Sequence, residues 1–282
     1  MQFKIPTAGV YVPDEKPEAE ALSRTTHMGI SAHQDDIEIM AMEGVINCFG
    51  LADKWFAGVI VTNGAGSARD DMYANYTDAE MQKIRRLEQK KAAFVGEYGA
   101  QVFLDFPSSA VKDPAATGPV EDLAALLLAA RPEIVYTHNL ADKHPTHIGT
   151  AMKVLAAIRS LPRDKRPKTL LGCEVWRDLD WMIDADKHVM RLDAHENIQT
   201  ALVSVFDSQV VGGKRYDLAT MGRRRAHATY HESHAVDASH LLNFAMDLTP
   251  LIEDDTLSPM DHVLAHIERF TGEVKANLAK FA

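Results

Sequence analysis

The stretch Ser31-Ala32-His33-Gln34-Asp35-Asp36-Ile37-Glu38 joins two apolar segments of the chain. The segment before it, about Met28 to Ala32, has the length and composition of a buried strand, and the segment after it, about Asp36 to Phe49, is apolar on most faces, like a buried helix. In α/β proteins, ligands bind where the end of a strand opens onto the start of a helix. The imidazole and carboxylate groups of this stretch therefore mark a candidate functional site.

Three side chains of this stretch have the chemistry of a metal site. Imidazole and carboxylate suit zinc or a similar divalent cation, and His33 and Asp36 are close enough in sequence to bind the same ion. Asp35 is then free to take a proton from a metal-bound water, because the metal lowers the pKa of that water towards ~7. The alternative is that the two aspartates only cap the helix and interact with its positive end.

Strand-like and helix-like segments alternate four times over the first 160 residues. The expected strands are 28–32, 56–62, 102–104 and 134–137, and the expected helices are 36–49, 77–98, one that begins at Pro119, and one that ends near Arg159. This alternation predicts an α/β fold, in which a Rossmann-like, mostly parallel sheet has helices on both faces. In the second half we expect strands at 170–176 and 189–192 and helices at 196–206, 217–230 and from 258 onward, whereas residues 1–27 are expected to be irregular.

Two histidines follow the strand expected at 134–137. His144 and His147 lie three residues apart, with Pro145 between them. Because the carboxyl ends of parallel strands meet at one edge of a sheet, we expect this pair to reach His33 and supply the missing metal ligand. The alternative is that both are histidines of a surface loop.

The composition limits the classes of partner. A formal charge of −10 over 282 residues argues against binding to nucleic acid or to an anionic membrane, and it favours a small neutral or cationic ligand. The two cysteines have no paired spacing, which indicates a reducing compartment, and we expect a cytoplasmic protein. The acidic N-terminal segment does not resemble a signal peptide, and no apolar run approaches the ~20 residues of a membrane span.

The second half of the chain contains further aromatic and histidine clusters. Trp176 and Trp181, with an arginine between them, could stack on a sugar ring, or they could fill the core. His227, His231 and His234 could bind a second metal, but a surface patch or the rim of an active site is the interpretation that we favour. We expect His262 and His266, on the last helix, to face solvent.

Several motifs together resemble those of the PIG-L (LmbE-like) zinc-dependent N-deacetylases. In that family the two metal motifs read Ala-His-Pro-Asp-Asp and His-Pro-Asp-His, and here residues 32–36 read Ala-His-Gln-Asp-Asp and residues 144–147 read His-Pro-Thr-His. The resemblance covers roughly residues 28–160. Weaker matches are Val61-Thr62-Asn63-Gly64, Arg85-x-x-Glu88, Ser208-Gln209 and Tyr230-x-Glu232.

The resemblance implies an LmbE-like three-layer sandwich and a role for each matching residue. The implied zinc ligands are His33, Asp36 and His147, the implied general base is Asp35, the implied acid or oxyanion-stabilising group is His144, and the implied sugar contacts are Arg85 and Tyr230. It also implies a single domain over residues 1–282, with a metal-binding core at 28–160 and a part that completes the substrate pocket at 161–282. Thr146 replaces the family's acid, so the partner that would orient His144 is open, and Asp142 is a candidate.

The expected activity is hydrolysis of an N-acetyl group with release of acetate. The resemblance implies an N-acetylglucosamine-type substrate: the free sugar, a chitobiose-like oligosaccharide or a glucosaminyl conjugate. Zinc is the expected cofactor, although another divalent metal could replace it. Family members are often oligomeric, so a homo-oligomer is open, but no segment of the sequence identifies an interface. The alternatives are a zinc amidase acting on a glucosaminyl-thiol conjugate and a non-catalytic sugar-binding protein. A nucleotide-binding loop at Asn63-Gly64-Ala65-Gly66 is disfavoured, because its glycine spacing fits neither common phosphate-binding motif.

Overall fold

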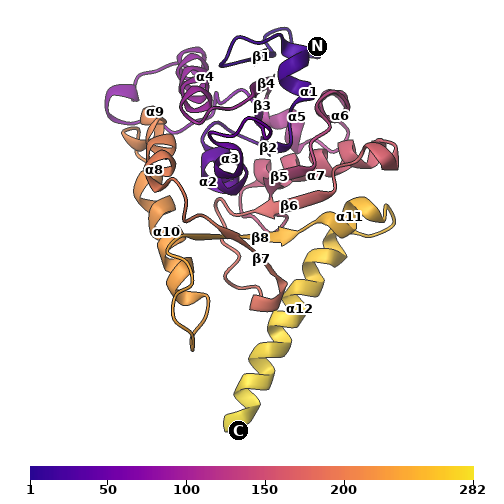
Figure 1. The fold of residues 1–282 in the computed structure, drawn as a ribbon, viewed down its shortest axis with the longest axis vertical. Coiled ribbons are helices and arrows are strands. Elements are labelled where there is room, and N and C mark those ends of the chain that lie inside the picture. The colour runs from indigo at the N-terminus through magenta and orange to yellow at the C-terminus, as the bar shows by residue number, and fades with distance from the viewer.

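One eight-stranded sheet runs through the computed structural model, which describes residues 1–282 (Figure 1). The strand order is β1-β4-β3-β2-β5-β6-β8-β7. The strands are β1 (Gly9–Tyr11), β2 (His27–Ser31), β3 (Phe56–Thr62), β4 (Ala100–Phe106), β5 (Ile134–His138), β6 (Thr169–Cys173), β7 (Lys187–Arg191) and β8 (Leu242–Asp247). The central strands β4, β3, β2, β5 and β6 are parallel, and β1, β7 and β8 join antiparallel at the two edges. The predicted α/β fold with a mostly parallel sheet is confirmed.

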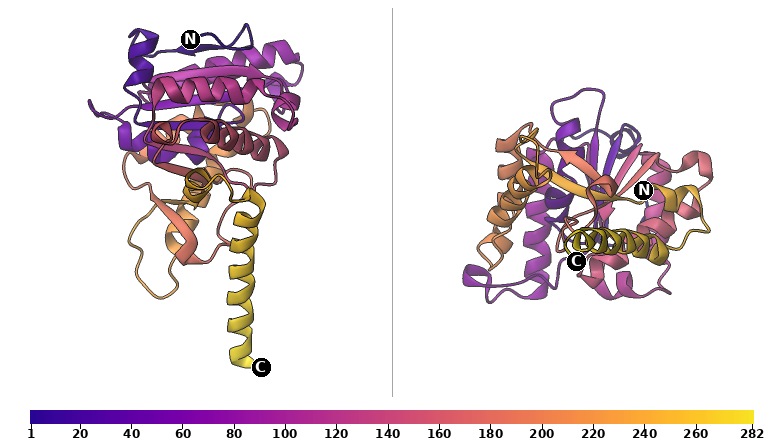
Figure 2. Two further views of the ribbon diagram at one scale, coloured as in Figure 1. Left: turned by 90° about the vertical axis from the view of Figure 1, so that its right-hand side faces the viewer. Right: turned by 90° about the horizontal axis from the view of Figure 1, so that it is seen from below.

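Helices cover both faces of the sheet (Figures 1 and 2). One apolar core contains side chains of α1 (Glu18–Ser23), α6 (Gly118–Ala130), α7 (Pro145–Ser160) and α11 (Thr249–Glu253). The other contains side chains of α2 (Asp36–Met40), α3 (Met42–Cys48), α4 (Asp78–Val95), α8 (Glu196–Ser204) and α10 (Tyr216–Tyr230). The remaining helices are α5 (Ser108–Lys112), α9 (Asp207–Val210) and α12 (Pro259–Leu278). None of these helices combines the length and apolar character needed to cross a bilayer.

The helix expected over 36–49 is broken into α2 and α3 at Ala41. Two side chains from the second half of the chain bind the carbonyls at the break. Arg224 donates to the carbonyls of Glu38 and Ile39, at 2.8 and 3.2 Å, and Asn243 donates to that of Ile39 at 3.0 Å. Carbonyls that accept from side chains are poorly placed to accept the next helical N–H, so the helix restarts one residue later.

Several short elements, including β1, α1 and β8, fall where the sequence predicted none. The N-terminal segment, expected to be irregular, contains β1 and α1, and β8 forms a strand near the opposite edge. Each is short, and β1 pairs antiparallel with β4 while β8 pairs antiparallel with β6 and β7. Their pairing is determined by distant partner strands, and their own residue pattern is too short to show it.

Candidate metal centre and active site

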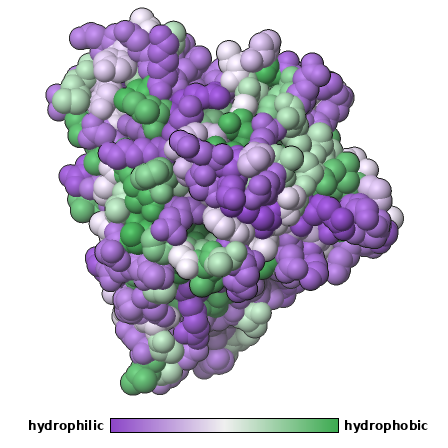
Figure 3. Space-filling model, turned by 45° about the horizontal axis from the view of Figure 1, so that its top comes forward, coloured by the Kyte–Doolittle hydropathy of each residue, from purple (hydrophilic) through white to green (hydrophobic).

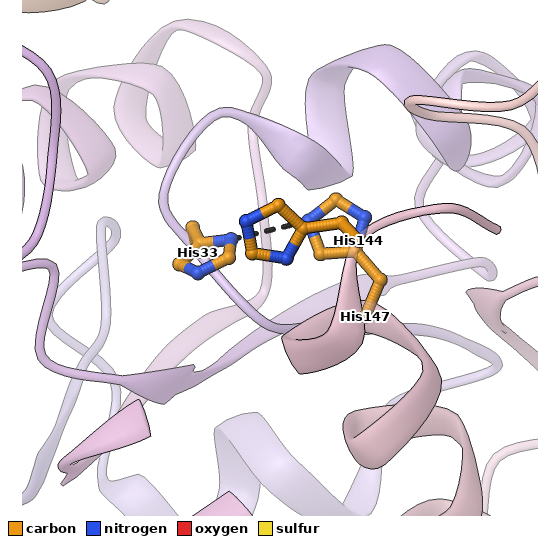
Figure 4. Close-up of side chains that lie close together, drawn as sticks. All are labelled: His33, His144 and His147. Atoms are coloured by element: carbon orange, nitrogen blue, oxygen red, sulfur yellow. Dashed lines mark hydrogen bonds between the residues drawn. The ribbon is translucent and has the colours of Figure 1, made fainter. Parts of the chain in front are cut away.

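The strand ends bring the two sequence motifs together. β2 and β5 are parallel neighbours in the sheet, so the loop that follows Ser31 and the loop that follows His138 leave the same edge. The first loop carries His33 and enters α2, and the second enters α7 at His144, whose Nδ1 accepts from the backbone N–H of Thr146 at 3.3 Å. Figure 4 shows His33, His144 and His147 facing one another across these loops.

Three ligand-type atoms form a compact triangle at this edge. Nδ1 of His33 lies 3.2 Å from Oδ2 of Asp36 and 3.2 Å from Nε2 of His147, and Oδ2 of Asp36 lies 3.4 Å from Nε2 of His147. Ligands about 2.0–2.2 Å from a tetrahedral zinc ion are separated by roughly 3.3–3.5 Å. The donor set and its spacing therefore fit one zinc ion with a fourth position left open.

Asp142 orients one of these ligands. Its Oδ2 lies 3.4 Å from Nδ1 of His147, and the same carboxylate accepts from the backbone N–H groups of His144 and Trp176, at 2.9 and 3.1 Å. A carboxylate on the far nitrogen fixes the tautomer and direction of a metal-binding imidazole. From the sequence, Asp142 was a candidate partner for the His144 ring, whereas in the structure its carboxylate contacts the His147 ring.

His138 belongs to the same cluster and was not among the predicted site residues. It is fully buried, and its ring stacks on that of His147 with 3.9 Å between centroids. Asp36, His138 and His147 also lie close enough to form a metal-binding group. However, Nε2 of His138 accepts from the backbone N–H of Ala32 at 2.8 Å, so its lone pair is engaged, and we assign His138 to the support of the site. Its place at the very end of β5 was the available sequence signal.

Asp35 points into the pocket from a strained position. Its backbone has φ 83°, in the region that glycine favours, and its N–H donates to Gln89 at 3.2 Å. Burial raises the pKa of Asp35 to about 7, while the Arg85 guanidinium opposes that rise. Strained, buried carboxylates with a displaced pKa are typical of functional groups.

Arg85 does not reach the pocket, contrary to the predicted sugar contact. It is 1% exposed, and its guanidinium donates to the Asp35 carboxylate at 2.9 Å, to the Gln34 carbonyl and to Glu88 at 3.3 Å. Glu88 in turn accepts from the N–H and the hydroxyl of Ser208, both at 2.7 Å. The Arg-x-x-Glu and Ser-Gln motifs therefore contact each other beneath the cavity. There Arg85 fixes the Asp35 carboxylate, and Glu88 fixes the start of α9 through Ser208.

A cavity of about 470 Å³ opens beside His33 and Asp36, and its volume suits a small ligand. Its lining includes His33, Asp35, Asp36, Gly64, Gly66, Ser67, Ala68, Ser108, Lys112, His144, Thr146, Trp176, Gln209, Lys214 and Tyr216. Trp176 and Tyr216 form an aromatic wall, with ring centroids 6.3 Å apart, and the Lys214 ammonium lies 4.9 Å from the Trp176 ring.

Tyr230, the other predicted sugar contact, lies outside this cavity. It is 79% exposed at the C-terminal end of α10, about 20 Å along the helix from Tyr216. Tyr216 begins α10 and lines the cavity. The prediction for Tyr230 rests on the short motif Tyr230-x-Glu232, and a motif of this length does not show which end of the helix lies at the site.

His144 lines the cavity beside the ligand triangle. Its ring centroid lies 5.1 Å from that of His33 and 4.5 Å from that of His147. Burial and these two histidines lower the pKa of His144 to about 4, so its ring is neutral near pH 7. Because its Nδ1 accepts from Thr146, the neutral ring carries its proton on Nε2, where it can donate a hydrogen bond.

The other histidine clusters have structural contacts. His227 is buried, with Nε2 3.1 Å from the Glu174 carboxylate and its ring stacked on Phe244 at 4.2 Å. His227, His231 and His234 do not come together as a metal-binding group. His266, expected on a solvated face, is buried with Nδ1 3.2 Å from the Asp186 carboxylate.

The sequence of this core is similar to one known family. Residues 28–158 match the PIG-L family model, described as GlcNAc-PI de-N-acetylase. No curated protein sequence matches the chain.

Solved structures that share the fold include a conserved protein, a deacetylase and a hydratase. The conserved protein TT1542 from Thermus thermophilus is 17% identical, with a TM-score of 0.62 over 82% of this chain and 98% of that one. N,N′-diacetylchitobiose deacetylase from Pyrococcus horikoshii is 13% identical, with a TM-score of 0.61 over 86% and 90%. GalB, the 4-carboxy-2-hydroxymuconate hydratase from Pseudomonas putida, is 15% identical, with a TM-score of 0.61 over 79% and 95%. The same fold therefore occurs in a deacetylase and in a hydratase, so the reaction has to be inferred from the residues of the site.

Proposed function

Since residues 28–158 match the PIG-L family, we propose that this protein is a zinc-dependent N-deacetylase that removes the acetyl group from an N-acetylglucosamine-type sugar. The observation that carries the proposal is the convergence of His33, Asp36 and His147 on one point beside Asp35 and His144. Three protein ligands with an open fourth position are typical of catalytic zinc, whereas structural zinc is closed by four. We retain the interpretation of residues 1–282 as one domain, with a core at 28–160 and a pocket-completing part at 161–282.

The residues around the triangle take distinct roles in this reaction. Zinc, or another divalent metal in its place, would supply an acidified water and polarise the acetamide carbonyl. Asp35 accepts the proton of the attacking water, and the Arg85 guanidinium keeps the carboxylate aimed at it. His144 donates a hydrogen bond from Nε2 to the developing oxyanion, and the proton taken up by Asp35 then passes to the leaving amine as the C–N bond breaks, which gives acetate and a free amine. Trp176 and Tyr216 offer the apolar faces against which a sugar ring packs.

The test is a direct measurement of the products. Metal-loaded protein is incubated with N-acetylglucosamine, N,N′-diacetylchitobiose and a glucosaminyl conjugate, and both acetate and free amine are measured. Equal release of the two supports the proposal. Cleavage of a glucosaminyl-thiol amide without acetate release would favour the amidase, and sugar binding by metal-free protein without turnover would favour a non-catalytic role.

A second candidate function has one observation in its favour. Lys112 and Lys214 line the cavity, and neither forms an ion pair within the chain. Although the chain as a whole is acidic, two unpaired ammonium groups next to a bound cation would attract an anionic substrate. GalB shares the fold and hydrates a carboxylated muconate. The second candidate is therefore the hydration of a carboxylated unsaturated substrate, which would show as loss of the substrate's ultraviolet absorbance without any acetate.

A further inference from the structure

Helix α12 projects from the body of the protein into solvent (Figures 1 and 2). Every residue from Ile267 onward is exposed, and a short 3₁₀ turn, Ala279–Phe281, continues the helix. Its polar contacts with the body come from three residues near its base. Nε2 of His262 lies 2.9 Å from the Asp247 carbonyl, and His266 and Arg269 both contact the Asp186 carboxylate.

The side of α12 that faces away from these contacts carries an apolar stripe. Its positions, which we call the α12 seam, are separated alternately by four and three residues: Met260, Leu264, Ile267, Thr271, Val274, Leu278 and Phe281. At 100° per residue, His262, His266 and Arg269 lie roughly opposite this stripe. Met260, Leu278 and Phe281 are 70%, 67% and 89% exposed. In Figure 3 the narrow lower end of the molecule carries hydrophobic side chains among hydrophilic ones.

A repeat of this kind is the pattern of a helix that pairs with another helix. Hydrophobic residues every 3.5 positions place one continuous apolar stripe against a partner helix. A surface helix without a partner usually has polar residues on its solvent side. Six of the seven seam positions are apolar. The α12 seam spans most of the helix, which is on the order of 30 Å long.

We propose that α12 pairs antiparallel with α12 of a second copy of this chain. The charged residues beside the α12 seam favour a second copy of this chain as the partner and an antiparallel direction of pairing. In the register that places Leu264 against Phe281 and Ile267 against Leu278 of the other copy, Glu268 of each helix lies beside Lys275 of the other, so two ion pairs form about one two-fold axis.

The parallel arrangement lacks these pairs. Lys275 and Glu268 flank the α12 seam on the same side, and the flanking positions on the other side are Val263, Phe270 and Asn277. In a parallel pair each charged position faces one of these uncharged residues. The antiparallel pair also keeps the two bodies at opposite ends of the joined helices, because each body is attached at the base of its own α12.

The base of α12 offers a place for the tip of the second helix. An apolar groove there is lined by Leu140, Ile148 and Met152, together with Met260, Val263 and Leu264 of α12 itself. In the antiparallel register the exposed Phe281 of the second copy reaches Leu264, at the edge of this groove. The groove extends the contact from the helix pair onto α7, the helix that carries His147.

The first experiment measures mass in solution by light scattering and sedimentation. The 31.2 kDa chain should form a dimer with about twice that mass. The double variant Ile267→Glu, Leu278→Glu should be monomeric. The control Leu87→Glu, Leu218→Glu, which changes two exposed leucines outside α12, should remain a dimer. A monomeric wild type at tens of micromolar, or a dimer that survives the Ile267→Glu, Leu278→Glu change, would overturn the proposal.

Charge reversal tests the direction of pairing. Glu268→Lys and Lys275→Glu should each raise the dimer dissociation constant by about tenfold, because each places like charges together twice. An equal mixture of the two single variants restores both ion pairs and should form a heterodimer as tightly as the wild type. If the mixture gains nothing over the separate variants, the antiparallel register is wrong. Metal content should be unchanged in all of these variants, since α12 holds no metal ligand.

Discussion

Arg85 and Asp35 form a buried ion pair, with Nη2 of the guanidinium 2.9 Å from Oδ2 of the carboxylate, next to Asp36. The arginine comes from α4 and the aspartate from the loop before α2, so two separate elements fix the direction of one carboxylate. Bidentate or charge-assisted contacts of this kind position a catalytic group more firmly than a neutral hydrogen bond does.

Replacing the proposed base tests its role apart from metal binding. Asp35→Asn removes the proton acceptor and leaves His33, Asp36 and His147 in place. We expect kcat for deacetylation to fall by ~10²–10⁴, which is the usual contribution of a general base. Metal analysis should still give one equivalent per chain. Undiminished turnover with full metal content would remove Asp35 from the mechanism.

The structure and the sequence give Arg85 two different roles, and kinetics can separate them. As a sugar contact it would affect KM, but as the holder of Asp35 it should affect kcat. We expect Arg85→Lys, which keeps the positive charge but loses the planar guanidinium with its several donors, to lower kcat by roughly 10²-fold. KM should stay within about twofold of the wild-type value. Steady-state kinetics on the sugar that proves to be a substrate separate the two. A rise in KM at constant kcat would restore the original interpretation.

Asp35 and Arg85 also show how much of the site could be predicted from the sequence. The meeting of His33, Asp35, Asp36 and His147 was predictable because each lies in a short motif that follows a buried strand, and adjacent parallel strands end at one edge of the sheet. Arg85 and Tyr230 were placed from motifs whose surroundings come from distant parts of the chain. Asp142 pairs with the ring of His147 and not with that of His144, and the break at Ala41 depends on Arg224 and Asn243, nearly 200 positions away. Such contacts are determined by tertiary packing, which local pattern does not show.

The ligand assignment predicts a graded response of metal affinity. His147→Ala removes a ligand and should abolish stoichiometric zinc binding at micromolar metal. His138→Gln removes only the support behind His147, so we expect zinc affinity to fall by about 10–100-fold with stoichiometry kept at saturation. Isothermal titration with zinc measures both. If His138→Gln loses the metal as completely as His147→Ala, then His138 is itself a ligand.

The aromatic wall predicts a binding effect. Trp176→Ala removes the largest apolar face of the cavity and should raise KM for an amino sugar by roughly 2–10-fold, with a smaller change in kcat. Trp181→Phe is the matched control, because Trp181 does not line the cavity. Equal effects of the two changes would indicate a general loss of packing and not a sugar contact.

A buried acid outside the cavity predicts how stability depends on pH. Burial raises the pKa of Glu38 to about 8, even though Tyr98 and Gln89 each donate to its Oε1 at 2.8 Å, and its Oε2 is buried without a partner. Between the ordinary value of 4.5 and about 8 the folded protein therefore holds a proton that the unfolded chain has lost.

The native state binds more protons in that window, so this group makes the free energy of unfolding fall as pH rises from 4.5 to 8. Glu38→Gln keeps the acceptor for Tyr98 and Gln89 and cannot ionise. We expect the variant to match the wild type near pH 4.5 and to exceed it by as much as roughly 4 kcal/mol near pH 8. Urea unfolding of both proteins across this range, with the exposed Glu253→Gln as control, measures the difference. Parallel stability curves for Glu38→Gln and the wild type would show that Glu38 is ionised in the folded protein.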